Sequence, residues 1–317
     1  MVGGRWLPAI CTFFAGSLAA VQARMNGELT LLSGNGIESA AISFGSGLAV
    51  ISILLFFIPS IRSGIARVPM AIRTGELNWW QLLAGLIGGF FVAVQSIVVP
   101  MIGVAIFTVA VVAGQSANSL VVDRIGLGPA GRQPITSGRI VAAVLAVLAV
   151  TLAAADRFTT GSVALAAVAM AVIAGLCVAV QQALNGRISI AAGSPLAATF
   201  YNFVFGTALL ASAFGLAWAL TDSDPGVVSG GPWWIYAGGV VGVVFIAVAA
   251  WTVPIIGVLV FALVSIAGQL SGALLLDVVA PTASSTIGWN LVAGVLLAFV
   301  AVAASSLGRL RPRVGPG

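Results

Sequence analysis

Ten apolar runs, each long enough to cross a lipid bilayer, follow one another along this chain of 317 residues. A spanning helix needs about 20 mostly apolar residues. Only 7% of the residues are charged, whereas a water-soluble domain carries roughly 25%. The pattern therefore predicts an all-α, multi-pass membrane protein that has lipid as its main solvent. The runs lie near 6–24, 37–58, 79–98, 101–122, 138–155, 163–184, 196–219, 233–252, 255–276 and 287–307.

A proline divides the longest uncharged stretch. Residues 82–122 carry no charge and are too many for a single span. Because proline breaks or kinks a helix interior, we expect Pro100 to separate two spans here. We expect Pro254 to separate two more spans near the C-terminal end.

One short phrase occurs twice, 159 residues apart: Gln22-Ala-Arg-Met-Asn26-Gly27 matches Gln181-Gln-Ala-Leu-Asn185-Gly186. A second set of matches has an offset of 154. Duplication in so apolar a chain is typical of a transporter built from two halves. We therefore predict five-helix repeats at 1–157 and 158–317, together forming one transport domain. The pairs at the second offset are Trp79/Trp233, Trp80/Trp234, Gly88/Gly242, Pro100/Pro254, Gly114/Gly268, Gln115/Gln269 and Asp123/Asp277.

An odd number of helices per half turns the second half upside down relative to the first. The positive-inside rule tests this inversion, because cytoplasmic loops carry an excess of Arg. With the N-terminus in the cytoplasm, eleven arginines lie inside, and only Arg24 and Arg157 lie outside. We therefore expect two inverted repeats in the inner (plasma) membrane of the cell, with both termini cytoplasmic.

The connector 59–78 carries three arginines among apolar residues. A segment of this kind can lie on the anionic inner leaflet of the membrane. The favoured interpretation is a basic connector whose only role is to fix the topology.

The chain lacks the residues on which most catalytic and metal sites depend. It has no His and no Lys, and its eight acidic residues lie mostly at expected helix ends. His is the commonest metal ligand and the usual acid–base group near neutral pH, so we expect no enzyme activity, no cofactor and no metal. The arginines are spread thinly, which argues against nucleic-acid binding. Cys11 and Cys177 lie within apolar runs and are expected to be buried thiols.

Several of these features together resemble a known family. The duplicated five-helix halves, the Gln-x-x-x-Asn-Gly phrases, Gly34, and the Gly-Gln of the fourth helices are similar to the drug/metabolite transporter superfamily. The YdcZ-like branch, whose members often carry a single half, is the most similar. The resemblance covers nearly the whole chain. It implies a ten-helix inverted-repeat fold with a central cavity, alternating access and export, and it implies no particular substrate.

Amide side chains are the main candidates for a substrate cavity. Gln22 and Asn26 are four residues apart, as are Gln181 and Asn185, so each pair shares one helix face. Amides in a membrane must face protein or a water-filled cavity. They could bind substrate, or they could act as interhelical glue worth roughly 1 kcal/mol each. The further cavity candidates are Gln95, Gln115, Asn118, Gln269, Tyr201 and Trp251.

Charged residues near helix ends are candidates for a gate or for proton coupling. Glu38 follows Asn35 by three residues, which favours a helix N-cap over a proton relay. Ser194 and Pro195 predict the start of the corresponding helix in the second half. Arg24 and Glu28 are spaced as an ion pair, which becomes a gate or coupling candidate if it lies within the bilayer.

Two aspartates end the fourth and ninth runs. The helix dipole disfavours a carboxylate at a helix C-terminus, so a compensating group is expected. Arg124 could compensate Asp123, whereas Asp277 has no charged neighbour in the sequence. Interfacial anchoring is favoured over gating for both.

The sequence thus favours a secondary-active transporter of a small organic metabolite or drug-like compound. The alternative is a non-transporting binding, scaffold or lipid-handling membrane protein with the same fold. Proton coupling and a homodimer remain open, although Gly85-x-x-x-Gly89 and Gly238-x-x-x-Gly242 favour packing within one chain over a dimer contact.

Overall fold

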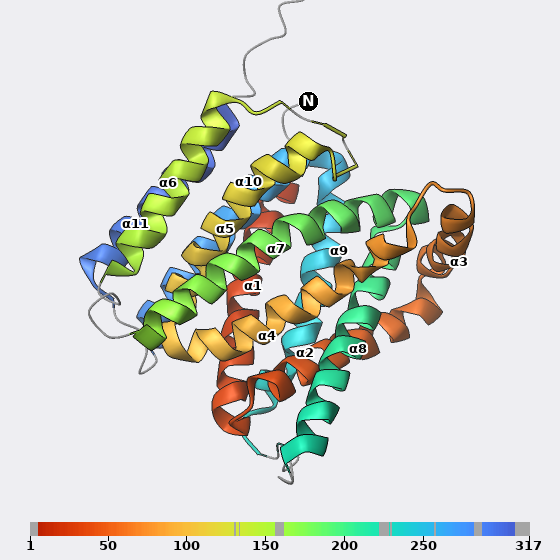
Figure 1. The fold of residues 1–317 in the computed structure, drawn as a ribbon, viewed down its shortest axis with the longest axis horizontal. Coiled ribbons are helices and arrows are strands. Elements are labelled where there is room, and N and C mark those ends of the chain that lie inside the picture. The colour runs from red at the N-terminus through yellow and green to blue at the C-terminus, as the bar shows by residue number, and fades with distance from the viewer. Residues whose placement is uncertain are drawn as a thin grey trace, which may run out of the picture.

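Every regular element of the described chain is helical (Figure 1). The computed structural model describes residues 6–129, 131–132, 134–155, 162–221, 228, 230–256, 258–281 and 287–307. Two short 3-10 helices, η1 and η3, lead directly into α4 and α9. The helices are α1 (Trp6–Ser33), α2 (Gly36–Phe57), α3 (Pro59–Arg73), η1 (Trp79–Leu83), α4 (Ala84–Ile102), α5 (Val104–Ile125), α6 (Ser137–Ala153), α7 (Ser162–Ala192), α8 (Pro195–Thr221), η3 (Trp233–Ala237), α9 (Gly238–Ile256), α10 (Val258–Val279) and α11 (Trp289–Leu307).

Within the described residues, six helices are long and apolar enough to cross a membrane. They are α1, α2, α4 with its leading turn, α5, α7 and α8. Four shorter apolar segments lie in α6, α9, α10 and α11. Large apolar side chains such as Phe56, Trp218 and Leu296 are exposed on the outside of the bundle, which fits a protein surrounded by lipid rather than water.

The first helix of each half is longer than the sequence predicts. We expected these spans to end near residues 24 and 184, but α1 continues to Ser33 and α7 to Ala192. Gly27 costs a helix only about 1 kcal/mol relative to Ala, and good helix formers follow it. Each helix instead ends immediately before a glycine in the left-handed region, Gly34 with φ 68° and Gly193 with φ 61°. Arg24 and Glu28 therefore lie within a helix and not in a loop.

The break between α4 and α5 confirms that the uncharged stretch is two helices. Pro100 lies inside α4, and the chain turns three residues later at Gly103, whose φ is 81°. A positive φ is available to glycine at little cost, so the helix passes the proline and ends at the glycine. The corresponding later break lies between α9 and α10, and the side chain of Pro254 lies outside the described residues.

The connector after α2 contains a helix, α3, which the sequence analysis did not expect. Helix α3 starts with Pro59 at its first turn and buries Ile61, Gly64, Val68 and Ala71. These residues recur at the three- and four-residue spacing of one helix face, a pattern that could have been read from the sequence. The face packs against α7 and α8, and the arginines of α3 remain exposed.

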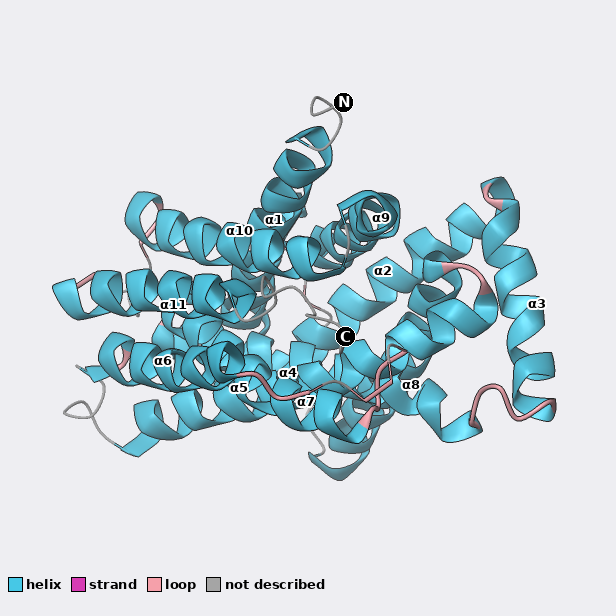
Figure 2. Ribbon diagram, turned by 90° about the horizontal axis from the view of Figure 1, so that it is seen from above, coloured by secondary structure: helices cyan, strands magenta, loops and turns pink. Residues whose placement is uncertain are grey.

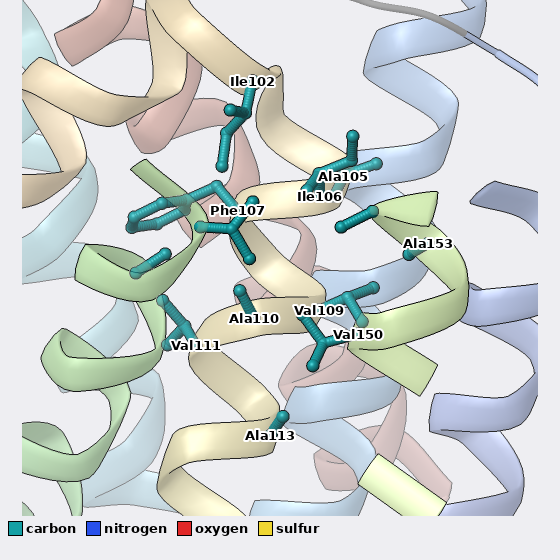
Figure 3. Close-up of a cluster of buried hydrophobic side chains, with 14 of the residues drawn as sticks. Ile102, Ala105, Ile106, Phe107, Val109, Ala110, Val111, Ala113, Val150 and Ala153 are labelled. Carbon is teal, nitrogen blue, oxygen red and sulfur yellow. The ribbon is translucent and has the colours of Figure 1, made fainter. Parts of the chain in front are cut away.

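The long helices α1 and α7 occupy equivalent places in the bundle. Helix α1 packs against α9 and α10, and α7 packs against α4 and α5. Figures 1 and 2 show α6 and α11 side by side at one end of the molecule and α3 at the other. Helix α5 is central: Figure 3 shows its Ile106, Phe107 and Val109 among buried side chains that also come from α6.

Candidate functional site

The candidate site lies where helices from opposite halves of the chain approach each other closely. A methyl group on Gly242 of α9 would lie 3.3 Å from Nε2 of Gln22 on α1. A methyl group on Gly88 of α4 would lie 2.6 Å from Nε2 of Gln181 on α7. The two glycines match at the 154 offset and the two glutamines at the 159 offset. The first-helix amide of each half thus packs on a glycine of the other half.

Two phenylalanines lie at the centre of this arrangement. The rings of Phe44 on α2 and Phe203 on α8 have centroids 5.0 Å apart and are tilted by 49°. Each ring is 6% exposed. Phe44 packs on Gly206 of α8, and Phe203 packs on Gly47 of α2. The ring pair also reaches both amide contacts, because Cζ of Phe203 is 3.6 Å from a methyl placed on Gly242, and Cζ of Phe44 is 3.4 Å from one placed on Gly88.

Sequence reasoning missed this ring pair. Phe44 and Phe203 are 159 residues apart, as are Gly47 and Gly206. Extending the first repeat into the second helix of each half would have found both matches.

The amides of the first half form a buried contact between α1 and α4. Nδ2 of Asn26 donates to Oε1 of Gln95 over 2.8 Å. Asn26 has no exposed surface and Gln95 is 5% exposed. Within the described residues, Oδ1 of Asn26 and the hydroxyl of Ser43 have no hydrogen-bond partner. Gln95 therefore contacts Asn26 through a hydrogen bond. The residue at the corresponding position of the second half is Ala249, whose side chain cannot form such a bond.

In the second half, a different residue forms a hydrogen bond with the corresponding asparagine, Asn185. Nδ2 of Asn202 on α8 donates to Oδ1 of Asn185 on α7 over 3.2 Å. Asn202 is the counterpart of Ser43 at the 159 offset. The backbone arrangement repeats, while the polar side chains that complete it do not.

Three of the remaining cavity candidates, Gln115, Asn118 and Tyr201, form hydrogen bonds to other helices. Gln115 donates to Oε1 of Gln182 over 2.9 Å, and Asn118 donates to the carbonyl of Leu176 over 2.7 Å. Both bonds join α5 to α7. The structure places the other residues as follows: Nε2 of Gln269 lies 3.4 Å from Oγ of Ser265, Tyr201 donates to the carbonyl of Ile65 on α3, and the side chain of Trp251 lies outside the described residues.

The Arg24–Glu28 ion pair forms along one face of α1. Nε of Arg24 lies 2.9 Å from Oε1 of Glu28, and the two side chains are 14% and 30% exposed. The pair borders a small opening between α1 and the α4–α5 junction, with room for about one water molecule. The other residues of its wall are Gly27, Leu31, Val99, Pro100, Gly103 and Val104.

Helix capping at Asn35 confirms the sequence prediction. Oδ1 of Asn35 accepts hydrogen bonds from the backbone N–H groups of Ile37 at 2.9 Å and Glu38 at 3.2 Å. Glu38 lies in the first turn of α2 and is 8% exposed. At the start of α8, Oγ of Ser194 accepts from the N–H of Ala197 at 3.3 Å, as the Ser-Pro pair indicates.

Asp277 has a partner that its sequence neighbours do not supply. Its side chain is 1% exposed, and Oδ2 accepts a hydrogen bond from the N–H of Ala105 over 2.8 Å. Ala105 lies in the first turn of α5, where the helix dipole favours a carboxylate. The compensating group that the sequence analysis expects for this carboxylate therefore comes from another helix, which provides the positive end of its dipole. Asp123 is half-buried at the last turn of α5.

Comparisons with known proteins give a family-model match in each half of the chain. A family model described as "Putative inner membrane exporter, YdcZ" matches residues 7–152 and 166–304, one segment in each half. A solved structure described as "Crystal structure of protein" is 17% identical, with a TM-score of 0.55, over 95% of this chain and 96% of that chain. At this identity the likeness concerns the fold alone. A comparison with curated proteins gives no match.

Proposed function

Since the chain belongs to the YdcZ family of inner membrane exporters, we propose that it is a secondary-active transporter that works by alternating access. In this proposal, ten spanning helices form two inverted five-helix repeats, residues 1–157 and 158–317. The substrate binds between the repeats, and rocking of one bundle against the other exposes the site to each side in turn.

The reciprocal contact of Phe44 and Phe203 is the observation that carries the proposal. Phe44 of the first half packs on Gly206 of the second, and Phe203 of the second half packs on Gly47 of the first. Because Phe44 corresponds to Phe203 and Gly47 to Gly206, the two contacts are equivalent. Contacts of this kind relate the two halves by an approximate two-fold axis. In this proposal the pair has two nearly equivalent arrangements, one opening each side of the membrane, as alternating access requires.

The proposed substrate is a small organic metabolite or drug-like compound, because amides and aromatic rings meet where the two halves contact each other. Amides from Gln22 and Gln181 provide hydrogen-bonding groups, and the two phenylalanine rings provide apolar, stackable surface. The chain has no Lys, and no cluster of Arg lies among the residues named at this contact, which disfavours a strongly anionic substrate. Export is the direction that the family supports.

Both termini are cytoplasmic in this proposal. Arginine side chains contact the backbone at the C-terminal ends of three helices, α2, α5 and α7, which would lie on the cytoplasmic side in this topology. Arg62 donates to the carbonyls of Leu55 and Phe56 at the end of α2. Arg187 donates to the carbonyls of Leu127 and Gly126 beyond α5 at 2.6 and 2.9 Å. Arg67 lies against Gly193 beyond α7. This arrangement supports the inside assignment because basic residues favour the cytoplasmic side.

Counterflow tests the proposal. The purified protein is first heated with a panel of metabolites and drugs, because a ligand at a hundredfold excess over Kd stabilises the folded state by about 2.7 kcal/mol. Each compound that raises the unfolding temperature is then loaded into sealed proteoliposomes, and entry of its labelled form is measured. A transporter gives transient accumulation of label. Saturable binding without accumulation would instead support the scaffold alternative.

A further inference from the structure

Helix α3 presents a basic face to the outside of the molecule. Its buried face packs against α7 and α8. The rest of the helix is exposed and carries all three arginines of the connector, Arg62, Arg67 and Arg73. Glu76 is the one acidic residue in the connector sequence 59–78. The connector therefore has a net positive charge, and α3 displays that charge on its exposed side.

Contacts with both halves of the chain hold α3 in place. A methyl on Gly64 would lie 2.7 Å from Cβ of Ala197, so the backbone of α3 packs closely on the start of α8. Nη1 of Arg62 donates to the carbonyls of Leu55 and Phe56 at the end of α2. The helix is thus no loose tether, and its exposed face has a fixed place at the edge of the molecule (Figure 2).

Exposed aromatic residues place α3 at the level of the lipid headgroups. Phe56 and Phe57 end α2 and are 80% and 75% exposed, and Trp79 and Trp80 begin η1 and are 66% and 40% exposed. Large apolar side chains exposed at the ends of spanning helices contact lipid, and Trp is typical of the membrane–water interface. Because α3 joins these two aromatic pairs, it lies along the membrane surface.

Two of the arginines lie along one stripe of the exposed face. Arg62 and Arg73 are eleven residues apart, close to three turns, so their side chains leave the helix in nearly the same direction. The exposed residues between them on this stripe are Ala66 and Pro69. Neither side chain is bulky, so the surface between the two positive charges is shallow and open to a flat partner.

The corresponding connector of the second half has the opposite charge. Residues 222–232 contain Asp222 and Asp224 and no arginine. In the proposed topology this connector lies outside, whereas α3 lies on the cytoplasmic side. The cytoplasmic leaflet contains anionic lipids and has a negative surface potential. Charge complementarity therefore favours contact between α3 and the lipids of that leaflet.

We propose that the exposed face of α3 binds anionic phospholipids of the inner leaflet, with Arg62 and Arg73 in contact with their phosphate groups. A guanidinium group binds phosphate oxygens through paired N–H donors. Arg62 has further N–H groups besides those of Nη1, so it binds the end of α2 and a phosphate together. The inference goes beyond the proposed function, because it depends on the cytoplasmic placement of α3 and not on transport.

Titration with short-chain phospholipids tests the binding. An environment-sensitive fluorophore is placed on Ala66→Cys, with Cys11 and Cys177 replaced by Ala, and the purified protein is titrated in a neutral detergent at low salt. Dioctanoyl-phosphatidylglycerol is compared with dioctanoyl-phosphatidylcholine. We expect the anionic lipid to bind about 25-fold more tightly, since each of two arginines near an anionic surface supplies roughly fivefold. Equal affinity for the two lipids would overturn the proposal.

The unfolding temperature of the unlabelled protein is an independent readout, because a ligand that binds the folded state stabilises it. The anionic lipid should raise this temperature more than the neutral lipid does at the same concentration. Equal shifts would count against the proposal in the same way as equal affinities.

Variants of one exposed arginine separate a binding site from general attraction. Arg73→Gln should lower the affinity for the anionic lipid about fivefold and leave the affinity for the neutral lipid unchanged. Arg73→Lys keeps the charge and should keep most of the preference. Arg124→Gln is the matched control, because Arg124 is exposed at the end of α5 on the same proposed side. An equal loss in Arg124→Gln and Arg73→Gln would show general attraction and contradict the site.

Two further arms test the kind of ligand and the side of the membrane. Glycerol phosphate shares the phosphate group and has no acyl chains, so it should not displace the anionic lipid at equal concentration. Displacement as effective as that by the lipid itself would identify a site for soluble phosphate compounds instead. A membrane-impermeant maleimide should label Ala66→Cys in inside-out vesicles and not in intact cells. Labelling in intact cells would overturn the assignment to the inner leaflet.

Counterflow separates this inference from the proposed function. Preference for the anionic lipid without counterflow of any compound supports the lipid site and contradicts transport. Counterflow by a protein that binds both lipids equally supports transport and contradicts the lipid site.

Discussion

The contact of α1 with α9 and the contact of α7 with α4 share their small residues and differ in their polar ones. Gly242 and Gly88 support corresponding glutamines, Gln22 and Gln181, in the two contacts. In the second contact Asn202 donates to Asn185, whereas in the first no residue of the described chain donates to the oxygen of Asn26. Glycines fix how closely two backbones approach, and this geometry is retained in both halves. The polar side chains differ between the halves, so the comparison separates what the glycines contribute from what the amides contribute.

The largest expected effect comes from blocking the close packing that both halves share. A methyl on Gly16 would collide with the backbone of Ser265 on α10, and one on Gly175 would collide with the backbone of Val111 on α5. Because backbone cannot move aside as a flexible side chain can, Gly16→Ala and Gly175→Ala should each cost about 3 kcal/mol. Thermal unfolding in detergent measures both.

Gly45→Ala and Gly215→Ala are the matched controls for this test. A methyl at either position has no atom within 4 Å, and alanine favours a helix over glycine. Both controls should unfold at or above the wild-type temperature. Equal unfolding temperatures for all four variants would show that close packing on Gly16 and Gly175 does not stabilise the two halves.

Removing the carboxylate of Asp277 should have the next largest effect. Its hydrogen bond to the N–H of Ala105 at the start of α5 is charge-assisted. We expect Asp277→Ala to lose about 2 kcal/mol of unfolding free energy and Asp277→Asn to lose less, because the amide oxygen still accepts. Thermal unfolding of Asp123→Ala, at the corresponding position, shows whether the comparison extends to this pair. Equal stability of Asp277→Ala and wild type would contradict the capping role.

The glutamines test whether the shared amides bind substrate or only join helices. Interhelical amide contacts contribute roughly 1 kcal/mol each, so Gln22→Ala with Gln181→Ala should lower the unfolding temperature only slightly. We expect the double variant to lose substrate affinity by a larger factor than folded yield. Titration and size-exclusion chromatography give the two quantities. Equal losses would assign the glutamines to structure alone.

The smallest effect on stability is expected at the Arg24–Glu28 pair. A partly exposed ion pair contributes under about 1 kcal/mol, so Glu28→Gln should unfold almost as the wild type does. If protons couple to transport through Glu28 or Glu38, replacement of that residue by Gln abolishes uptake driven by a pH gradient and spares exchange. Uptake assays in proteoliposomes distinguish these outcomes, and pH-driven uptake retained in both variants removes both residues as proton carriers.

The sequence predicted the number, order and approximate places of the apolar helices, because each is an uninterrupted apolar run. It also predicted the cap at Asn35, since capping depends on residues close in the chain. The extent of α1 was wrong because Gly27 is tolerated within a helix, whereas Gly34 adopts a positive φ and ends it.

Long-range partners were beyond sequence reasoning. Asp277 is compensated by Ala105, 172 residues away, and no local pattern points to that contact. Phe44 and Phe203 carried a signal in the repeat offset, but only the structure shows that their rings meet. The use of Asn202 in one half and Ser43 in the other is visible in the sequence as a difference, and its consequence for Asn26 depends on geometry.

Access to position 22 from each side of the membrane tests the central claim most directly. Gln22→Cys is introduced with Cys11 and Cys177 replaced by Ala, and a membrane-impermeant maleimide is applied to intact cells and, separately, to inside-out vesicles. Alternating access predicts that the same cysteine is labelled from both sides. Labelling from one side only, or from neither while the denatured protein reacts fully, would contradict a site that the two halves expose in turn.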